Sequence, residues 1–404
     1  MKEKFPIFAK KKEGVDLIYL DSAATTHKPQ IVIDTITNFY SNEYATVHRG
    51  LYKQALDVTN RLEKVRSQVA DFICCNKEEV IFTHSATESL NLIAYSYGEK
   101  NIREGDEILV SIEEHHSNYL PWKLLCDRKK GRFITFTDLN DFKKKLTRRT
   151  KIVAITHQSN VLGRINPIKE IARLAHAFSA VVVVDGAQMV AHDRVNVKDL
   201  DVDFYAFSGH KMYGPTGVGV LFGKYLLLEQ MDPFHGGGAM VERIEEEIVF
   251  RLPPHKFEAG TPMIASILGL GAAIDFINDV GFEVIKEHEH ALSCELYDLL
   301  EGKVKFLNPH CRGFSILTFT TESLHPIDIA TLLSLDNISV RAGNMCAQPL
   351  LNSLGLDSVL RVSLGIYNNF KDIEKFAFAL FDLQKKSSAI SCRAFVNSSI
   401  STTL

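Results

Sequence analysis

The feature that most constrains the fold is an alternation of strand-like and helix-like segments between residues 60 and 225. Residues 180–185 contain four consecutive valines followed by an aspartate. Such a β-branched run suits a strand buried on both faces, as in a parallel sheet covered by helices. Further strands are expected at 79–83, 107–111, 152–156 and 204–207, with helices at 88–97 and 168–178. This order predicts an α/β fold.

The pattern changes near residue 271 and predicts a smaller α+β domain. Its expected elements are helices at 264–278, 283–300 and 371–385 and strands at 314–319 and 338–341. The predicted organisation is an N-terminal segment packing on the small domain, a large domain, the small domain and a mobile tail rich in Ser and Thr. The corresponding ranges are 1–20, 21–270, 271–386 and 387–404.

Charge and cysteine content exclude several classes of protein. The 46 basic and 49 acidic residues give a net charge of -3, which provides no electrostatic footprint for nucleic acid or an anionic membrane. Residues 1–12 lack the apolar run of a signal peptide, and no stretch reaches the roughly 18 apolar residues of a membrane span. The seven cysteines show no repeated spacing, so we expect reduced thiols and a cytoplasmic location.

The strongest local motif is Ser208-Gly209-His210-Lys211, which is followed by the glycine-rich segment 214–219. A lysine at the end of a strand, flanked by small residues, can bind a planar aldehyde cofactor. The alternative is a surface lysine before a turn. Asp185 ends a predicted strand, and open α/β sheets bind ligands at the carboxyl ends of strands. Its carboxylate would keep a pyridine nitrogen protonated, or it would simply cap a helix.

Two further loops offer ligand-binding groups. Residues 85–88, Ser-Ala-Thr-Glu, lie between a predicted strand and a helix and suit either a phosphate or a capping box. His115 and His116 follow another strand. Adjacent histidines face different ways and no third ligand is evident, so we predict no metal site. An imidazole stacked on an aromatic cofactor, or a hydrogen-bonded loop histidine, is the expected role.

These motifs resemble the class V aminotransferase fold group and, within it, the SufS-type (group II) cysteine desulfurases. The resemblance extends from residue 19 to about residue 385. It is carried by the segments Tyr19–Thr26, His48–Gly50, Glu114–His116, Thr156–Gly163, Asp185–Gln188, Ser208–Lys211, Phe257–Pro262 and Arg341–Cys346. It implies a type I pyridoxal-phosphate transferase fold, with a mainly parallel sheet sandwiched by helices and a smaller α+β C-terminal domain.

The resemblance also implies roles for individual residues. Lys211 would bind pyridoxal 5'-phosphate covalently and act as a base, and Cys346 would accept sulfur from L-cysteine. Other cofactor contacts would come from Asp185, Gln188, His115, Ala86, Thr87, Ser208, His210 and, across the interface of a homodimer, Thr261. The substrate would meet Asn160, Arg361, Arg341 and His48. Without the resemblance, Cys346 would be interpreted as an ordinary buried cysteine, although its flanking residues suggest a loop.

One departure from the family concerns the partner. Relatives commonly carry two histidines before the reactive cysteine, where this chain has Asn344 and Met345. A histidine of this loop ligates zinc in relatives that use a zinc-bearing SufU-type acceptor, so we expect a SufE-type acceptor here, supplying sulfur for iron–sulfur cluster assembly. Selenocysteine lyase or another class V activity is the alternative, and a non-catalytic scaffold is the alternative from a different class.

Overall fold

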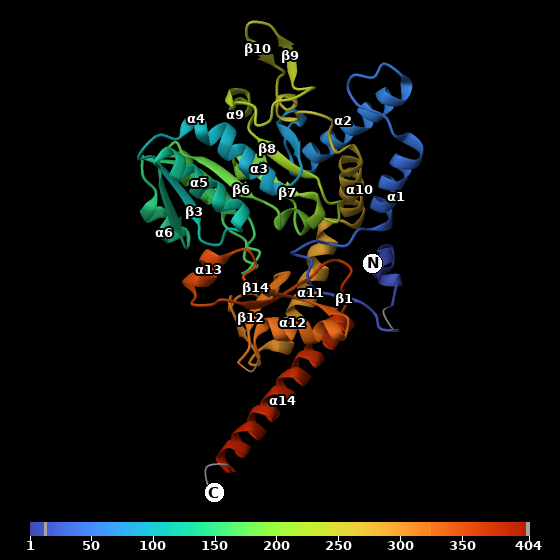
Figure 1. Cartoon of the computed structure of the whole chain (residues 1–404), viewed down its shortest axis with the longest axis vertical. Coiled ribbons are helices and arrows are strands. Elements are labelled where there is room, and N and C mark those ends of the chain that lie inside the picture. The colour runs from blue at the N-terminus through green and yellow to red at the C-terminus, as the bar shows by residue number, and fades with distance from the viewer. Residues whose placement is uncertain (12–13, 323, 401–404) are drawn as a thin grey trace. The chain divides into compact units, whose positions relative to one another are not determined.

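The computed structural model describes residues 1–11, 14–322 and 324–400, which form two compact units (Figure 1). Unit 1 comprises Met1–Ala24, Asn160–Arg164 and Lys286–Leu404, and unit 2 comprises Thr25–Ser159 and Ile165–Ile285. The division differs from the predicted ranges in three ways. Residues 21–24 belong to unit 1 and not to the large domain. The boundary after the large domain falls inside a helix at 285, and the internal segment 160–164 belongs with the two ends of the chain.

Unit 2 is built on a seven-stranded sheet with the order β2-β8-β7-β6-β5-β3-β4. All pairs are parallel except those of β8, which runs against both of its neighbours. The predicted mainly parallel sheet is therefore confirmed. Its strands are β2 (Val80–Thr83), β3 (Glu107–Ser111), β4 (Arg132–Phe136), β5 (Thr150–Thr156), β6 (Val181–Asp185), β7 (Phe204–Ser208) and β8 (Gly219–Gly223).

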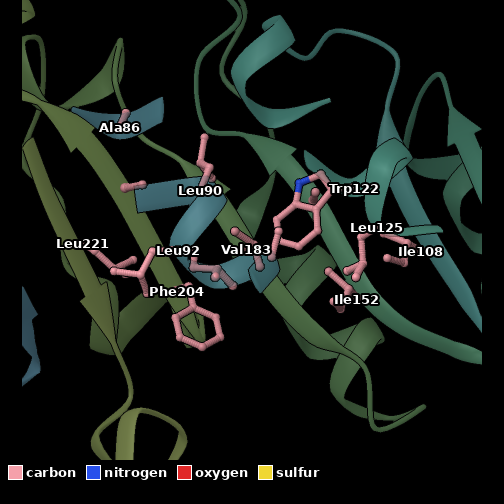
Figure 2. Packing of buried hydrophobic residues seen from close by; sticks show 14 of the residues in the cluster. Ala86, Leu90, Leu92, Ile108, Trp122, Leu125, Ile152, Val183, Phe204 and Leu221 are labelled. Atoms are coloured by element: carbon pink, nitrogen blue, oxygen red, sulfur yellow. The ribbon is translucent and has the colours of Figure 1, made fainter. Parts of the chain in front are cut away.

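Helices cover the sheet and form an apolar core with it. Figure 2 shows Leu90 of α3 (Ala86–Leu92) and Trp122 of α5 (Leu120–Lys129) around Val183 of β6. All three side chains are fully buried. Burial of one such side chain stabilises a fold by roughly 1.5–3 kcal/mol. The other short helices of the unit are α4 (Glu99–Asn101), α6 (Leu139–Lys145), α7 (Ile168–His176), α8 (Val197–Leu200) and α9 (Tyr225–Gln230).

In unit 2, α10 (Ile264–Val280) packs against both α1 (Gln30–Asn38) and α2 (Lys53–Ile73). The hairpin of β9 (Val241–Ile244) and β10 (Ile248–Phe250) stands away from the sheet (Figure 1). Within the described residues, no single helix has the length and apolar character to span a membrane. Among these residues, one pair of helices, α10 and α11 (Phe282–Leu300), reaches that length and composition only when the two are counted together, and the pair is bent by 76°.

Unit 1 contains a four-stranded antiparallel sheet with the order β11-β12-β15-β14 and a core shared with α11, α12 (Pro326–Leu335) and α14 (Phe370–Ile400). The strands are β11 (Lys305–Phe306), β12 (Ile316–Thr320), β14 (Arg341–Gly343) and β15 (Val359–Ser363), and α13 (Gln348–Ser353) precedes β15. The N-terminal segment packs here: the rings of Phe5 and Tyr367 lie 5.0 Å apart, and Lys2 pairs with Asp372 at 2.9 Å.

One prediction for unit 1 needs correction. The single strand expected at 338–341 is two strands, because β13 (Ile338–Ser339) pairs with β1 (Ile18–Tyr19) whereas β14 pairs with β15. The mobile tail from residue 387 stays a prediction, and α14 continues to Ile400. Neither glycine nor proline occurs between 370 and 400, so the sequence contains no helix breaker. Residues 401–404, also assigned to the tail, lie outside the described residues.

Candidate active site

The carboxyl ends of β6 and β7 lie side by side, with Asp185 paired to Ala206. Asp185 is buried, and its Oδ1 accepts a hydrogen bond from the N–H of Ala187 at 2.9 Å, while Oδ2 accepts none from the described residues. Burial raises the pKa of Asp185, and the positive charge of Lys211 acts against that rise. A buried carboxylate with one free oxygen is suited to a protonated ring nitrogen.

Four of the predicted cofactor residues are brought together around the start of α3. Ser208 Oγ, at the end of β7, accepts a hydrogen bond from the N–H of Ala86 at 2.8 Å. The hydroxyls of Thr87 and Ser117 lie 2.8 Å apart, and Ser117 Oγ lies 3.0 Å from His115 Nδ1. This clustering of hydroxyls and helix N–H groups fits a phosphate.

The start of α3 also shows the capping predicted for Ser85. Its side chain accepts from the N–H of Glu88 at 3.2 Å, whereas the carboxylate of Glu88 accepts from the N–H of His84 and not from that of Ser85. Gly219 allows β8 to approach this turn, because a Cβ at position 219 would lie 2.5 Å from the carbonyl carbon of Ser85. Close packing of backbone against the turn thus requires glycine here.

The peptide before Lys211 is held by a segment whose role the sequence did not reveal. The carbonyl of His210 accepts hydrogen bonds from Thr25 Oγ1 at 3.0 Å, Thr26 N at 3.0 Å and Lys28 Nζ at 2.9 Å. Burial lowers the pKa of Lys28 to about 7, and burial together with the charges of Lys211 and Lys28 lowers that of His210 to about 4. His210 is therefore neutral at pH 7, with Nδ1 3.1 Å from Thr25 Oγ1.

His115 is oriented by its own loop. The N–H of Ser117 donates to His115 Nδ1 at 3.1 Å, which leaves the proton of the neutral ring on Nε2. The preceding Glu114 is fully buried and accepts from Asn118 Nδ2 and from the N–H of Thr156, both at 2.6 Å. A ring fixed in this way suits stacking on a planar cofactor. No group of three or more His, Cys, Asp or Glu side chains in the described part of the chain is placed to hold a metal ion.

Three predicted residues of unit 2 have other surroundings. Gln188 is buried just beyond Asp185. His48 and Thr261 line a shallow pocket of about 180 Å³, and no hydrogen bond among the described residues joins them to the cluster at α3. The backbone of His48 is left-handed (φ 69°), and its N–H donates to Thr59 Oγ1 at 2.9 Å. Burial lowers the pKa of His48.

The motif Phe257–Pro262 also includes a structural ion pair. Both carboxylate oxygens of Glu258 accept from Arg66, at 2.7 and 2.8 Å, and one also accepts from the N–H of Phe82 at 2.8 Å. Arg66 is only 1% exposed. Glu258 therefore ties α2 to β2, a function that its position in a motif did not indicate.

The substrate residues predicted in unit 1 surround a single carboxylate, Asp21. Arg341 contacts it with Nε and Nη2, the shortest distance being 2.8 Å, and Arg361 Nη2 donates to it at 3.0 Å. Arg361 is 2% exposed and its Nη1 donates to the carbonyl of Asn160 at 3.0 Å. Its buried Nε has no hydrogen-bond partner among the described residues.

Cys346 lies on a loop after β14 and is exposed, which excludes the interpretation as a buried thiol. Met345 and Cys346 both have left-handed backbones, with φ of 54° and 52°. The loop is nevertheless tied down: Asn344 Oδ1 accepts from the N–H of Cys346 at 3.1 Å, Asn160 Nδ2 donates to the carbonyl of Met345 at 2.9 Å, and the Met345 side chain is buried.

Other cysteines differ from Cys346 in their surroundings. Cys126 and Cys311 are buried, and burial raises their pKa values to about 12 and about 11. The partly buried Cys75 also has its pKa raised by burial. Since thiolates are the reactive form, these three suit structural roles. The side chain of Cys392 lies outside the part of the chain whose side chains the structure describes.

Comparisons with known proteins identify the family of this chain. The family model Aminotransferase class-V matches residues 18–376. A probable cysteine desulfurase of Halalkalibacterium halodurans is 43% identical over 94% of this chain and 96% of its own length. Crystal structures of the cysteine desulfurase CsdA from Escherichia coli (35% identity, TM-score 0.88) and of a cysteine desulfurase from Thermococcus onnurineus NA1 (34%, 0.90) each cover 95% of this chain, with 97% of their own length matched. The chain therefore belongs to the class V aminotransferase family, among the homologues of cysteine desulfurases.

Proposed function

We propose that this chain is a pyridoxal-phosphate-dependent cysteine desulfurase, which converts L-cysteine to L-alanine and leaves a persulfide on Cys346. The observation that carries the proposal is the exposed thiol of Cys346 on a tied, left-handed loop next to β14. Cysteine desulfurases about 40% identical to this chain over nearly its whole length support it.

Unit 2 supplies the residues for the cofactor. Pyridoxal phosphate, when bound, supplies an electron sink for the negative charge that develops on the substrate Cα. Lys211 would hold the cofactor covalently, and its amine would serve as the base for the proton on the substrate Cα. The carboxylate of Asp185 would pair with the ring nitrogen, Gln188 would donate to the phenolic oxygen, and His115 would lie against the ring. Ala86 N–H, Thr87, Ser208 and His210 would hold the phosphate.

Unit 1 supplies the residues for substrate and sulfur. Arg361 and Asn160 are assigned to the carboxylate of L-cysteine, because a guanidinium fork is the natural match for a carboxylate. The thiolate of Cys346 attacks the substrate sulfur, forming an S–S bond as the substrate C–S bond breaks. The electron pair of that bond stays with the carbon fragment, which takes up a proton and leaves as L-alanine. Arg341, and His48 of unit 2, are also assigned to the substrate.

We assign the chain to the SufS type, with a SufE-type acceptor, a role in iron–sulfur cluster assembly and a cytoplasmic location. Asn344 replaces a potential zinc-ligating histidine, and its side chain is engaged with the backbone of Cys346. The test measures L-alanine formation with each acceptor. Strong acceleration by a zinc-loaded SufU-type protein, without acceleration by a SufE-type protein, would contradict the assignment.

A homodimer is part of the proposal. Large apolar side chains are exposed between residues 31 and 56, including Tyr40, Tyr44 and Leu51, the last being 92% exposed. The exposed Thr261 is proposed to reach the cofactor phosphate of the partner subunit. Light scattering coupled to gel filtration tests this state, and a monomer at micromolar concentration would refute it.

Mass spectrometry after incubation with L-cysteine tests the central reaction. We expect one added sulfur on the peptide that contains Cys346, removable by dithiothreitol, and equimolar L-alanine. Alanine formation without sulfur on that peptide would refute the proposed role of Cys346. Failure of the protein to bind pyridoxal phosphate would refute the enzyme itself.

A further inference from the structure

Five residues of unit 1 are joined in a ring by polar contacts and by one stretch of the chain, and a sixth residue, Cys346, adjoins it. From Asp21 the ring passes to Arg361, then to the carbonyl of Asn160, and from Asn160 Nδ2 to the carbonyl of Met345. The chain itself connects Met345 back through β14 to Arg341, whose guanidinium returns to Asp21. The sixth residue is Cys346, which follows Met345 directly. One carboxylate therefore joins the predicted substrate arginine to the loop that presents the thiol.

The two arginines meet Asp21 in different surroundings. Arg361 is buried, and burial lowers its pKa against the opposing influence of Asp21. Arg341 has a side chain 47% exposed, and its hydrogen bond to Asp21 raises its pKa, with a weaker contribution from Cys346. Burial and the negative charge of Asp21 both raise the pKa of Tyr19 to about 12. Two guanidinium groups against one carboxylate leave one net positive charge in the ring, which a single ligand carboxylate would neutralise.

We propose that Asp21 is a positioning residue, which fixes Arg361 for the substrate carboxylate and at the same time restrains Arg341 from pairing with the thiolate of Cys346. This proposal rests on the desulfurase function proposed above. Asp21 needs no contact with substrate or cofactor in this role. Its carboxylate holds the two guanidinium groups in separate orientations, because each of them contacts Oδ1 and Arg341 alone also contacts Oδ2.

The Asp21→Asn variant tests this proposal through thiol reactivity. Without L-cysteine present, the rate of alkylation of Cys346 by iodoacetamide at pH 7 is followed by mass spectrometry of its peptide. Loss of the anion and release of Arg341 both favour the thiolate, so we expect the rate to rise roughly 3- to 10-fold. In steady-state assays the KM for L-cysteine rises roughly 10-fold, because Arg361 loses its fixed orientation.

Asp298→Asn is the matched control. In unit 1, the carboxylate of Asp298 also accepts two hydrogen bonds from an arginine, Arg312, at 2.8 and 2.9 Å. The side chains of Asp298 and Arg312 are both about half exposed. Alkylation and KM should stay at wild-type values in this control. A second variant, Arg341→Gln, leaves Asp21 on Arg361 and should keep alkylation within about 2-fold of wild type, because Asp21 already holds Arg341 away from the thiolate. Combined with Asp21→Asn, it should remove the part of the acceleration that comes from the released guanidinium.

The outcomes separate the two proposals. Alkylation of Cys346 at the wild-type rate in Asp21→Asn would overturn the role of Asp21, even if wild-type protein forms the persulfide. A wild-type protein that forms no persulfide would instead overturn the desulfurase function, while the alkylation rates still report on the contacts of Asp21. If Asp21→Asn does not fold, an unchanged rate in Arg341→Gln supports the restraint on Arg341, and a fall of several-fold overturns it, because it would show that Arg341 already stabilises the thiolate.

Discussion

Gly219→Ala measures how much one close backbone contact contributes to the cofactor site. A Cβ at position 219 would lie 2.5 Å from the carbonyl carbon of Ser85 and 2.6 Å from its Cα. Ordinary contact begins at 3.4 Å, so β8 and the turn before α3 must separate by about 0.9 Å. The atoms that the Cβ meets belong to the backbone of Ser85 and cannot rotate away, and the next residue is Ala86, whose N–H binds Ser208.

Two magnitudes follow for Gly219→Ala. Overpacking of this kind lowers the free energy of unfolding by about 1–3 kcal/mol. A displacement of nearly 1 Å in a binding site can weaken its function about 100-fold, so we expect the Kd for pyridoxal phosphate to rise roughly 10- to 100-fold. Urea unfolding gives the first quantity, and titration of the cofactor-free protein with pyridoxal phosphate, followed by absorbance, gives the second.

Gly236→Ala is the control for this substitution. No atom lies within 4 Å of a Cβ at position 236, and the backbone there is not left-handed. We expect an unfolding free energy within about 0.5 kcal/mol of wild type and an unchanged Kd. If Gly219→Ala lowers stability but leaves the Kd unchanged, the turn at Ser85 is not part of the cofactor site. If neither quantity changes, the argument from close packing is wrong.

Three further predictions concern other regions. Glu258→Gln should lower the free energy of unfolding, measured by urea unfolding, by about 3–5 kcal/mol, because it leaves the buried Arg66 without its main anion. An effect below about 1 kcal/mol would contradict this. His176 has its pKa raised by a hydrogen bond to Asp203, so its stabilisation is complete below pH 6.5 and is lost as pH rises through the raised value. His176→Asn should therefore lower Tm at pH 5.5 but not at pH 8.5, and an equal loss at both would refute the ion pair. Cys346→Ala should abolish L-alanine formation from cysteine but retain it from selenocysteine, whereas equal activity on both substrates would show that the thiol is dispensable.

Strand ends were the most predictable part of the site. The valine run before Asp185 and the segment before Ser208 predict buried strands, and parallel strands place their carboxyl ends at one edge of the sheet. Asp185 and Ser208 accordingly end β6 and β7. β8 was not predicted, because glycines at both of its ends resemble a turn. Their role is close packing against other segments, which no local pattern reveals.

Long-range polar contacts were the least predictable part. The carbonyl of His210 is bound by Thr25 and Lys28, more than 180 residues earlier. Asp21 similarly meets Arg341 and Arg361 across more than 300 residues. Hydrophobic periodicity identifies which face of an element is buried, but it carries no information about which polar side chain meets which carbonyl. The motifs therefore marked these segments as important without indicating what their residues bind.

The loop of Cys346 shows how a departure from family pattern can be compatible with the same chemistry. Two successive left-handed residues without glycine cost roughly 1–2 kcal/mol each, and such strain persists only where surrounding contacts enforce it. Here the contacts are the buried side chain of Met345, the Asn344 side chain on the N–H of Cys346, and Asn160 on the carbonyl of Met345. A histidine at 344 or 345 would have to replace one of the first two contacts to remain available for zinc. Asn344 and Met345 therefore favour a fixed, exposed thiol, and this is the physical basis for expecting an acceptor that brings its own thiol and no zinc.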